Sequence, residues 1–136
     1  DYKKSEKDDL KNMETGLFGF KGRVCFRTGN CLNEILDKQD RTLPKQELFA
    51  VISGIIDKEI HRNYTIYPGN YVAYDLLSGE SRFKDKYTEE DKVRFEEYLS
   101  KQLAKIDIPN KDEEFLRGKL VAMYANPLRN YLVAIG

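Results

Sequence analysis

The sequence predicts a single domain over residues 1–136, of the α+β class and predominantly helical, with helices packed around a short buried helix and one or two short strands. Three observations support this prediction. A chain of 136 residues is long enough for one compact core but short for two. Apolar residues recur at helical spacing along most of the chain. Strict alternation of apolar and polar residues is convincing in one segment alone, residues 23–28.

A helix is expected first, near the N-terminus. Ser5, with Asp8 three residues later, resembles a capping box, in which each residue satisfies a backbone N–H of the other. Apolar residues then follow at helical spacing. Gly16 or Gly19 can end this helix, because glycine readily adopts the backbone conformations found after a last helical turn.

The strand expected at residues 23–28 has two chemically different faces. One face carries Val24, Phe26 and Thr28, and the other carries Arg23, Cys25 and Arg27. A lone strand leaves backbone N–H and C=O groups unpaired, so it needs a partner. We expect that partner to be residues 64–67, residues 131–135, a second copy of the chain in a homodimer, or a sheet outside the chain.

The middle of the chain is expected to hold two helices. Pro44 begins the first, since its missing N–H costs little in a first turn. Its apolar stripe comprises Leu48, Val51, Ile52, Ile55, Ile56 and Ile60. Pro68 and Gly69 break the pattern, and Asn70 is expected to cap a short helix that reaches Leu77. Because this second helix is apolar on nearly all sides, we expect it at the centre of the core.

Two longer helices are expected in the C-terminal half. Thr88 caps the first, and Pro109 ends it. Asn110 caps the second, which should stop at Pro127 because proline removes a helical hydrogen bond. The inner faces are expected to carry Phe95, Tyr98, Leu99, Leu103 and Ile106, then Leu116, Leu120, Met123 and Tyr124. Residues 128–135 form an apolar tail that is either a short helix or a strand.

The composition argues against several classes of function. The 23 basic and 23 acidic residues cancel, so no general field favours binding to nucleic acid. Cys25 and Cys31 have no second pair and no histidine at ligand spacing, so we expect free thiols and no metal site. The chain contains no phosphate-cradling glycine loop, no nucleophile elbow and no dinucleotide fingerprint, and no cofactor is expected.

Cellular location can also be inferred from the sequence. The longest apolar run, residues 48–56, is far shorter than the ~18 residues that suggest a membrane span. The N-terminus lacks the apolar core of a signal peptide, so we expect a cytoplasmic location. The first residue is Asp1 rather than methionine, which suggests a fragment of a longer protein.

Four of the nine tyrosines lie around one Pro-Gly pair, between residues 64 and 74. They either lock two helices together or form a surface for a ligand or partner. The candidate binding residues are Tyr67, Asn70, Tyr71, Tyr74, Arg23 and Arg27. His61 has Asp57 at i−4 and could serve as a general base, but a contact on a helix surface is the favoured interpretation. No catalytic residue is assigned.

Two blocks resemble glycerophospholipid acyltransferases of the 1-acylglycerol-3-phosphate type. Residues 20–32 are similar to the late strand and turn of that family, with Cys31 where proline is usual. Residues 63–77 hold Asn-Tyr and then Asn-Tyr-Val-Ala-Tyr-Asp-Leu-Leu, which resembles the C-terminal extension of such enzymes from Bacteroidetes-type bacteria. Residues 9–22 are similar to the segment before that strand.

The resemblance implies the C-terminal, non-catalytic region of a bacterial phospholipid-biosynthesis acyltransferase. The catalytic signature of that family is His-x-x-x-x-Asp, but Ile66 stands five residues after His61 here. The implied partner is therefore the enzyme's own catalytic domain, which alone would meet the acyl donor and the lysophospholipid. The parent protein would lie on the inner face of the cytoplasmic membrane. The alternative is a free-standing interaction or small-ligand-binding module.

Overall fold

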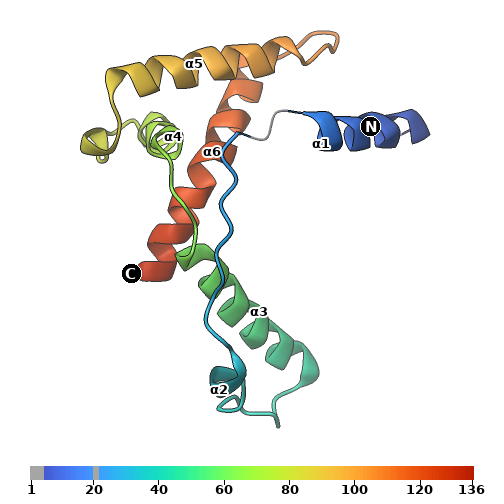
Figure 1. Cartoon of the computed structure of the whole chain (residues 1–136), viewed down its shortest axis with the longest axis vertical. Coiled ribbons are helices and arrows are strands. Elements are labelled where there is room, and N and C mark those ends of the chain that lie inside the picture. Colours follow the sequence, from blue (N-terminus) through green and yellow to red (C-terminus); the bar gives the residue numbers. More distant parts are fainter. Residues whose placement is uncertain (1–4, 20–21) are drawn as a thin grey trace.

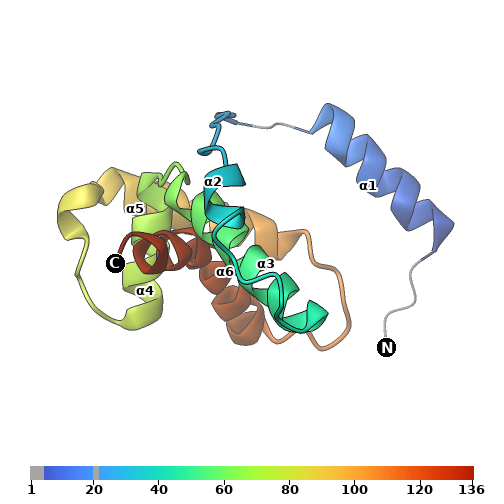
Figure 2. The ribbon, with the colours of Figure 1, turned by 90° about the horizontal axis from the view of Figure 1, so that it is seen from below.

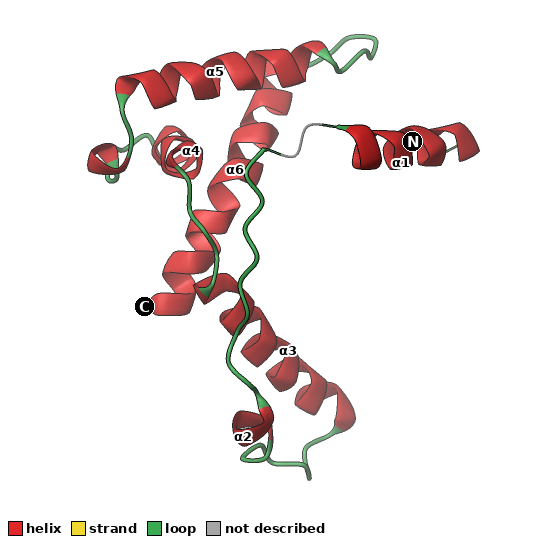
Figure 3. Cartoon of the chain, in the orientation of Figure 1, coloured by secondary structure: helices red, strands yellow, loops and turns green. Residues whose placement is uncertain are grey.

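A computed structural model describes residues 5–19 and 22–136. These residues form six α-helices and one 3-10 helix (Figure 1). The elements are α1 (Glu6–Phe18), α2 (Asn33–Leu36), α3 (Lys45–Arg62), α4 (Pro68–Ser78), η1 (Lys84–Lys86), α5 (Glu89–Ala104) and α6 (Glu113–Ile135). The predominantly helical class is confirmed. The described part of the chain contains no strand, so the expected strand is wrong (Figure 3).

Residues 22–32 are extended without belonging to a sheet. They run beside residues 63–67, but the hydrogen bonds to that neighbouring region pass through side chains. The Thr65 hydroxyl donates to Cys25 Sγ at 3.4 Å, and the Asn30 N–H donates to the Glu59 carboxylate at 2.7 Å. A strand requires a ladder of backbone hydrogen bonds, and side-chain contacts do not supply one.

The core lies where α4 meets α5 and α6. Its buried members are Val72, Ala73, Phe95, Leu99, Val121 and Ala125. The expectation that α4 occupies the centre of the core is therefore confirmed. We expected α3 to pack around α4 as well, but it packs against α6 and contains no fully buried residue.

Local capping follows the sequence closely at two helices. At α1, the Asp8 N–H donates to Ser5 Oγ, and the Ser5 N–H donates back to the Asp8 carboxylate at 2.8 Å. At α5, Thr88 and Asp91 form the same reciprocal pair. Both predicted helix starts are confirmed, because each capping box involves residues only three positions apart.

The last helix departs from prediction at both ends. The N-cap of α6 is Asp112, whose carboxylate accepts the Phe115 N–H at 2.9 Å, whereas Asn110 has a left-handed φ of 53°. The helix also continues through Pro127 as far as Ile135. Residues 128–135 are therefore helical.

A side chain of α4 contacts the backbone of α6 in the turn before Pro127. Proline has no N–H for the carbonyl of Met123, and its ring crowds the preceding turn. In that turn, the carbonyl of Tyr124 accepts a hydrogen bond from Asn70 Nδ2 at 2.8 Å. Leu128, one residue beyond the proline, is buried. The helix thus continues, with a buried residue directly after the proline, beyond the point where the local sequence predicts its end.

The buried face of α6 agrees only in part with the predicted one: Leu120 and Tyr124 pack against the core as expected, but the fully buried residues are others. Val121, Ala125 and Leu128 are buried. Of the residues predicted for this face, Met123 is 52% exposed and Tyr124 is half-buried. The small side chain of Ala125 is completely buried. The prediction considered only large apolar residues, so it did not include this alanine in the buried face.

A buried carboxylate anchors the loop that follows α4. Asp75 is 4% exposed and accepts hydrogen bonds from the Phe83 N–H at 3.1 Å and from the Tyr87 hydroxyl at 3.0 Å. The chain leaves α4 through Gly79, whose φ of 71° is a left-handed conformation that glycine adopts easily. Asp75 thus fixes both the loop and the approach to α5.

The N-terminal part extends away from this core. Helix α1 lies apart from the other helices in both views (Figures 1 and 2). None of its residues is buried. Apolar side chains of α1 and of residues 22–28 are therefore exposed.

Candidate functional site

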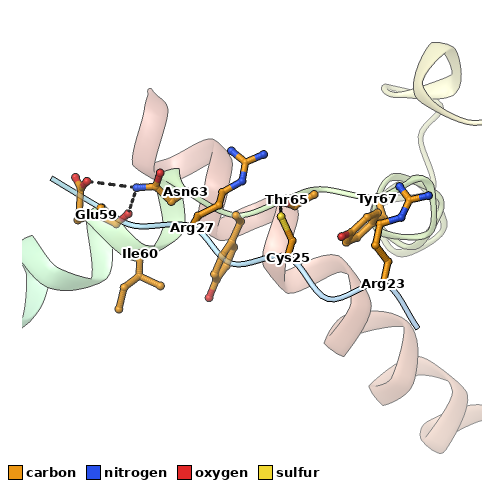
Figure 4. Close-up of a pocket in the computed structure, with 10 residues that line it drawn as sticks. Arg23, Cys25, Arg27, Glu59, Ile60, Asn63, Thr65 and Tyr67 are labelled. Carbon is orange, nitrogen blue, oxygen red and sulfur yellow. Dashed lines mark hydrogen bonds between the residues drawn. The ribbon is translucent and has the colours of Figure 1, made fainter. Parts of the chain in front are cut away.

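A pocket of about 450 Å³ lies between residues 22–30 and residues 63–67, beside the end of α3 (Figure 4). The side chains that give it chemical character are Arg23, Cys25, Arg27, Glu59, Thr65 and Tyr67.

The alternation along residues 23–27 builds one wall of the pocket. Arg23, Cys25 and Arg27 all line it, as expected for residues that share one face of an extended segment. Cys25 lies between the two arginines and points toward Thr65 (Figure 4). The guanidinium of Arg23 stands 5.9 Å from the ring centroid of Tyr67.

The pocket is positively charged around Cys25. Neither Arg23 nor Arg27 forms an ion pair with any carboxylate of residues 5–19 and 22–136. The pKa of Cys25 is lowered from its ordinary value, chiefly by the hydrogen bond from the Thr65 hydroxyl and then by one from Arg27. The positive charges of both arginines act in the same direction. Negative charge is therefore favoured at this position.

Glu59 supplies the opposite charge at the far end of the pocket. Its Oε1 accepts the Asn30 N–H at 2.7 Å and Asn63 Nδ2 at 3.3 Å, and its Oε2 lies 3.7 Å from Arg62 Nη1. A Cβ at Gly29 would come within 2.8 Å of Glu59 Cγ, so a larger residue at this position would have to displace the Glu59 side chain. Glu59 therefore fastens the extended segment to the end of α3.

The structure brings together three of the six candidate binding residues. Arg23, Arg27 and Tyr67 line the pocket. The amide of Asn70 is occupied on both sides: its oxygen accepts the Tyr67 N–H at 2.9 Å and its nitrogen donates to a backbone carbonyl of α6. Asn70 was expected to be the N-cap of α4. In the structure Tyr67 is the N-cap, and Asn70 is the third residue of the helix.

The other two candidates lie elsewhere. The rings of Tyr71 and Tyr74 both pack against Phe83, each with centroids 5.3 Å apart. Tyr74 also lines a separate pocket of about 400 Å³ with Arg129. The spacing that places two tyrosines on one face of α4 therefore directs them toward the loop after that helix.

Sequence reasoning missed Glu59 and Thr65. Thr65 lies in the extended run after α3 and carries no motif. Glu59 is one of many acidic residues in the sequence. It accepts a hydrogen bond from Asn30, which lies 29 residues earlier in the chain. No sequence signal indicates this long-range hydrogen bond.

His61 does not form the expected pair with Asp57. Its Nε2 lies 3.4 Å from Asn130 Nδ2, and its ring is edge-on to Tyr64 at 5.3 Å. Within the described residues, His61 takes part in no ion pair. Because His61 lies on α3 and Asn130 lies on α6, the histidine is part of the contact between these two helices.

Cys25 and Cys31 are both free and exposed. No group of three or more His, Cys, Asp or Glu side chains in the described residues could hold a metal ion. Among the helices described, none has the length and apolar character needed to cross a bilayer. Comparisons with protein-family models, curated proteins and solved structures found no match to this chain.

Proposed function

We propose that this chain is the C-terminal, non-catalytic region of a phospholipid-biosynthesis acyltransferase, and that its N-terminal part docks onto the catalytic domain of that enzyme. The sequence resemblance at residues 20–32 and 63–77 supports the choice of family. The observation that carries the docking role is the exposure of apolar side chains in α1 and residues 22–28. They are Leu10, Met13, Leu17, Phe18, Val24 and Phe26.

This exposure is unusual for an isolated domain. Phe26 is 92% exposed, and Leu17 on α1 is 73% exposed. Single exposed apolar residues are common, but a run of them over two neighbouring elements is typical of a surface that another protein covers. The extended segment also has backbone groups that can pair with a strand of another domain.

The two faces of the extended segment suggest how docking is arranged. Arg23, Cys25 and Arg27 line the pocket against residues 63–67. Val24 and Phe26 alternate with them and are exposed. In the proposed arrangement, the catalytic domain packs on the Val24 and Phe26 face and leaves the pocket intact.

The chemistry of acyl transfer belongs to the other domain in this proposal. The family's base is the histidine of a His-x-x-x-x-Asp motif, which deprotonates the acceptor hydroxyl. The gene upstream of Asp1 should encode that motif within the same protein. Its absence there would overturn the assignment to this family.

Point substitutions in the full-length protein test the docking role. Burying a phenylalanine contributes about 1.5–3 kcal/mol, so Phe26→Asp should weaken docking by about tenfold or more. We expect lower acyl transfer to lysophosphatidate and a lower melting temperature. Val133→Asp is the matched control, because Val133 on α6 is 82% exposed and lies outside this surface. Equal behaviour of the two variants would contradict the docking role.

A second candidate function is a free-standing module that binds a small ligand. The pocket that joins Arg23, Arg27 and Tyr67 favours it. The two candidates are distinguished by the upstream gene sequence and by the activity of the Phe26→Asp variant. Ligand binding in the pocket is tested separately below.

A further inference from the structure

We propose that the pocket between residues 22–30 and 63–67 binds a phosphate monoester, with the guanidinium groups of Arg23 and Arg27 holding the phosphate. This inference names the ligand class for the binding-module candidate. It does not depend on the acyltransferase assignment, because every residue that lines the pocket lies between positions 23 and 67 of this chain.

Charge is the first argument. The two guanidinium groups face one pocket, and no described carboxylate pairs with either. A phosphate monoester carries about 1.5 to 2 negative charges at neutral pH, which matches two arginines. Guanidinium groups present forked N–H donors that suit phosphate oxygens.

The spacing of the arginines is compatible with a shared ligand. An extended chain rises about 3.3 Å per residue, which separates the Cα atoms of Arg23 and Arg27 by about 13 Å. Arg27 lies beside Cys25 and the Arg23 guanidinium lies beside Tyr67 (Figure 4), so rotation of the Arg23 side chain toward Cys25 would let both guanidinium groups meet a tetrahedral anion between them. The contact of Arg23 with Tyr67, at 5.9 Å from the ring centroid, leaves that guanidinium with free N–H donors.

The groups between the arginines also favour an anion. The Thr65 hydroxyl, which donates to Cys25 Sγ, is a neutral donor rather than a competing negative charge. The lowered pKa of the Cys25 thiol reports a local environment that stabilises negative charge. The carboxylate of Glu59 lies toward the Gly29 end, where Asn30, Asn63 and Arg62 already engage it.

The size of the pocket points to an ester rather than to free phosphate. A volume of about 450 Å³ falls in the range of sites for small organic ligands. Ile60 and Tyr64 also line the pocket and offer apolar surface. The organic group of the ester is expected to lie along these two side chains.

Cys25 provides a direct readout of occupancy. A ligand bound between the arginines covers the Cys25 thiol and slows its alkylation by iodoacetamide. Cys31 is an internal control, since it is exposed and does not line the pocket. With phenyl phosphate as the probe, alkylation at Cys25 should fall to a plateau while that at Cys31 stays constant. Potassium chloride at equal ionic strength, and phenol at equal concentration, should protect neither thiol.

Arginine variants assign the protection to the proposed contacts. Arg23→Gln and Arg27→Gln should each raise the half-protecting concentration of phenyl phosphate by about tenfold, because each removes a charge-assisted hydrogen bond. Arg94→Gln makes the same charge change on the exposed face of α5 and should leave that concentration unchanged. Protection is compared with and without phenyl phosphate within each variant, since the arginines also affect thiol reactivity.

Vesicles identify the source of the phosphate. Protection by phenyl phosphate supports a soluble monoester, and protection only by vesicles containing phosphatidic acid supports a lipid headgroup; phosphatidylcholine vesicles are the control. The proposal is overturned if neither phosphate source protects Cys25 beyond potassium chloride. Equal protection of Cys31, or equal behaviour of Arg23→Gln, Arg27→Gln and Arg94→Gln, would overturn it as well.

Discussion

Replacing Asp75 with alanine tests whether a buried carboxylate holds residues 79–87 against α4. The substitution removes the acceptor of the Phe83 N–H and of the Tyr87 hydroxyl, at 3.1 Å and 3.0 Å. Each donor left without a partner costs about 1–3 kcal/mol. Both donors belong to half-buried residues, so water can reach them in part. We expect a total loss of about 2–4 kcal/mol in the free energy of unfolding.

Two companion variants sharpen this prediction. Asp75→Asn keeps one oxygen for the Phe83 N–H, so it should cost less than alanine, about 1–2 kcal/mol. Tyr87→Phe should cost less in the Asp75→Ala background than in the native chain, because the two residues share a hydrogen bond.

The assay is urea unfolding followed by far-ultraviolet circular dichroism, together with hydrogen exchange at the Phe83 amide. Asp85→Ala is the matched control, since Asp85 lies in the same loop and its carboxylate is exposed beside Lys86. The control should leave the urea midpoint unchanged. The reasoning is refuted if Asp75→Ala and Asp85→Ala unfold at the same midpoint and the Phe83 amide keeps its protection.

Three further predictions concern the core, the proline in α6 and alkaline pH. Leu99 is 1% exposed, so Leu99→Ala should cost about 2–5 kcal/mol, and Leu77→Ala, at a position 42% exposed, should cost clearly less in the same urea titration. Asn70→Ala should cost about 1–2 kcal/mol because it removes the acceptor of the Tyr67 N–H at the start of α4 and the hydrogen bond to α6; an unchanged urea midpoint would mean that neither bond contributes. Burial raises the pKa of Tyr87 and Tyr124 above the ordinary value of 10.0. The neutral forms of these tyrosines therefore stabilise the folded state fully below pH 10.0, and this stabilisation is lost as the pH rises further. The melting temperature should fall above pH 10.0, and a melting temperature that stays constant from neutral pH to well above pH 10.0 would contradict this prediction.

Prediction from sequence was most accurate where the stabilising contact is local. The starts of α1 and α5 follow from Ser5 with Asp8 and from Thr88 with Asp91, each pair three residues apart. The central position of α4 also follows from its own composition, because a helix that is apolar on nearly all sides must be buried.

The expected strand was correct in its faces and wrong in its pairing. Alternation does place Arg23, Cys25 and Arg27 on one side of residues 22–30. Alternation says nothing about whether another backbone comes close enough to form a ladder. In the structure, the neighbouring segment is reached through the side chain of Thr65, so the segment remains extended without becoming a strand.

The candidate site was partly predictable for the same reason. Arg23 and Arg27 were identified from their common face, and Tyr67 from its place beside the Pro-Gly pair. Tyr71 and Tyr74 were expected to join them, but the orientation of α4 turns both toward Phe83. That orientation depends on how α4 packs against α5 and α6, which local spacing does not encode.

The sequence by itself determined most helices, two of their caps and the chemically distinct faces of residues 23–28, because these features depend on residues a few positions apart. The tertiary structure alone decided that α6 passes through Pro127 and that a pocket forms beside Cys25. Near the proline, Asn70 contacts Tyr124 from 54 residues away and Leu128 is buried, and beside Cys25 the pocket includes Thr65, which lies 40 residues away. Contacts over such separations exist only after the chain has folded, since bringing distant residues together has an entropic cost that only the packed core offsets.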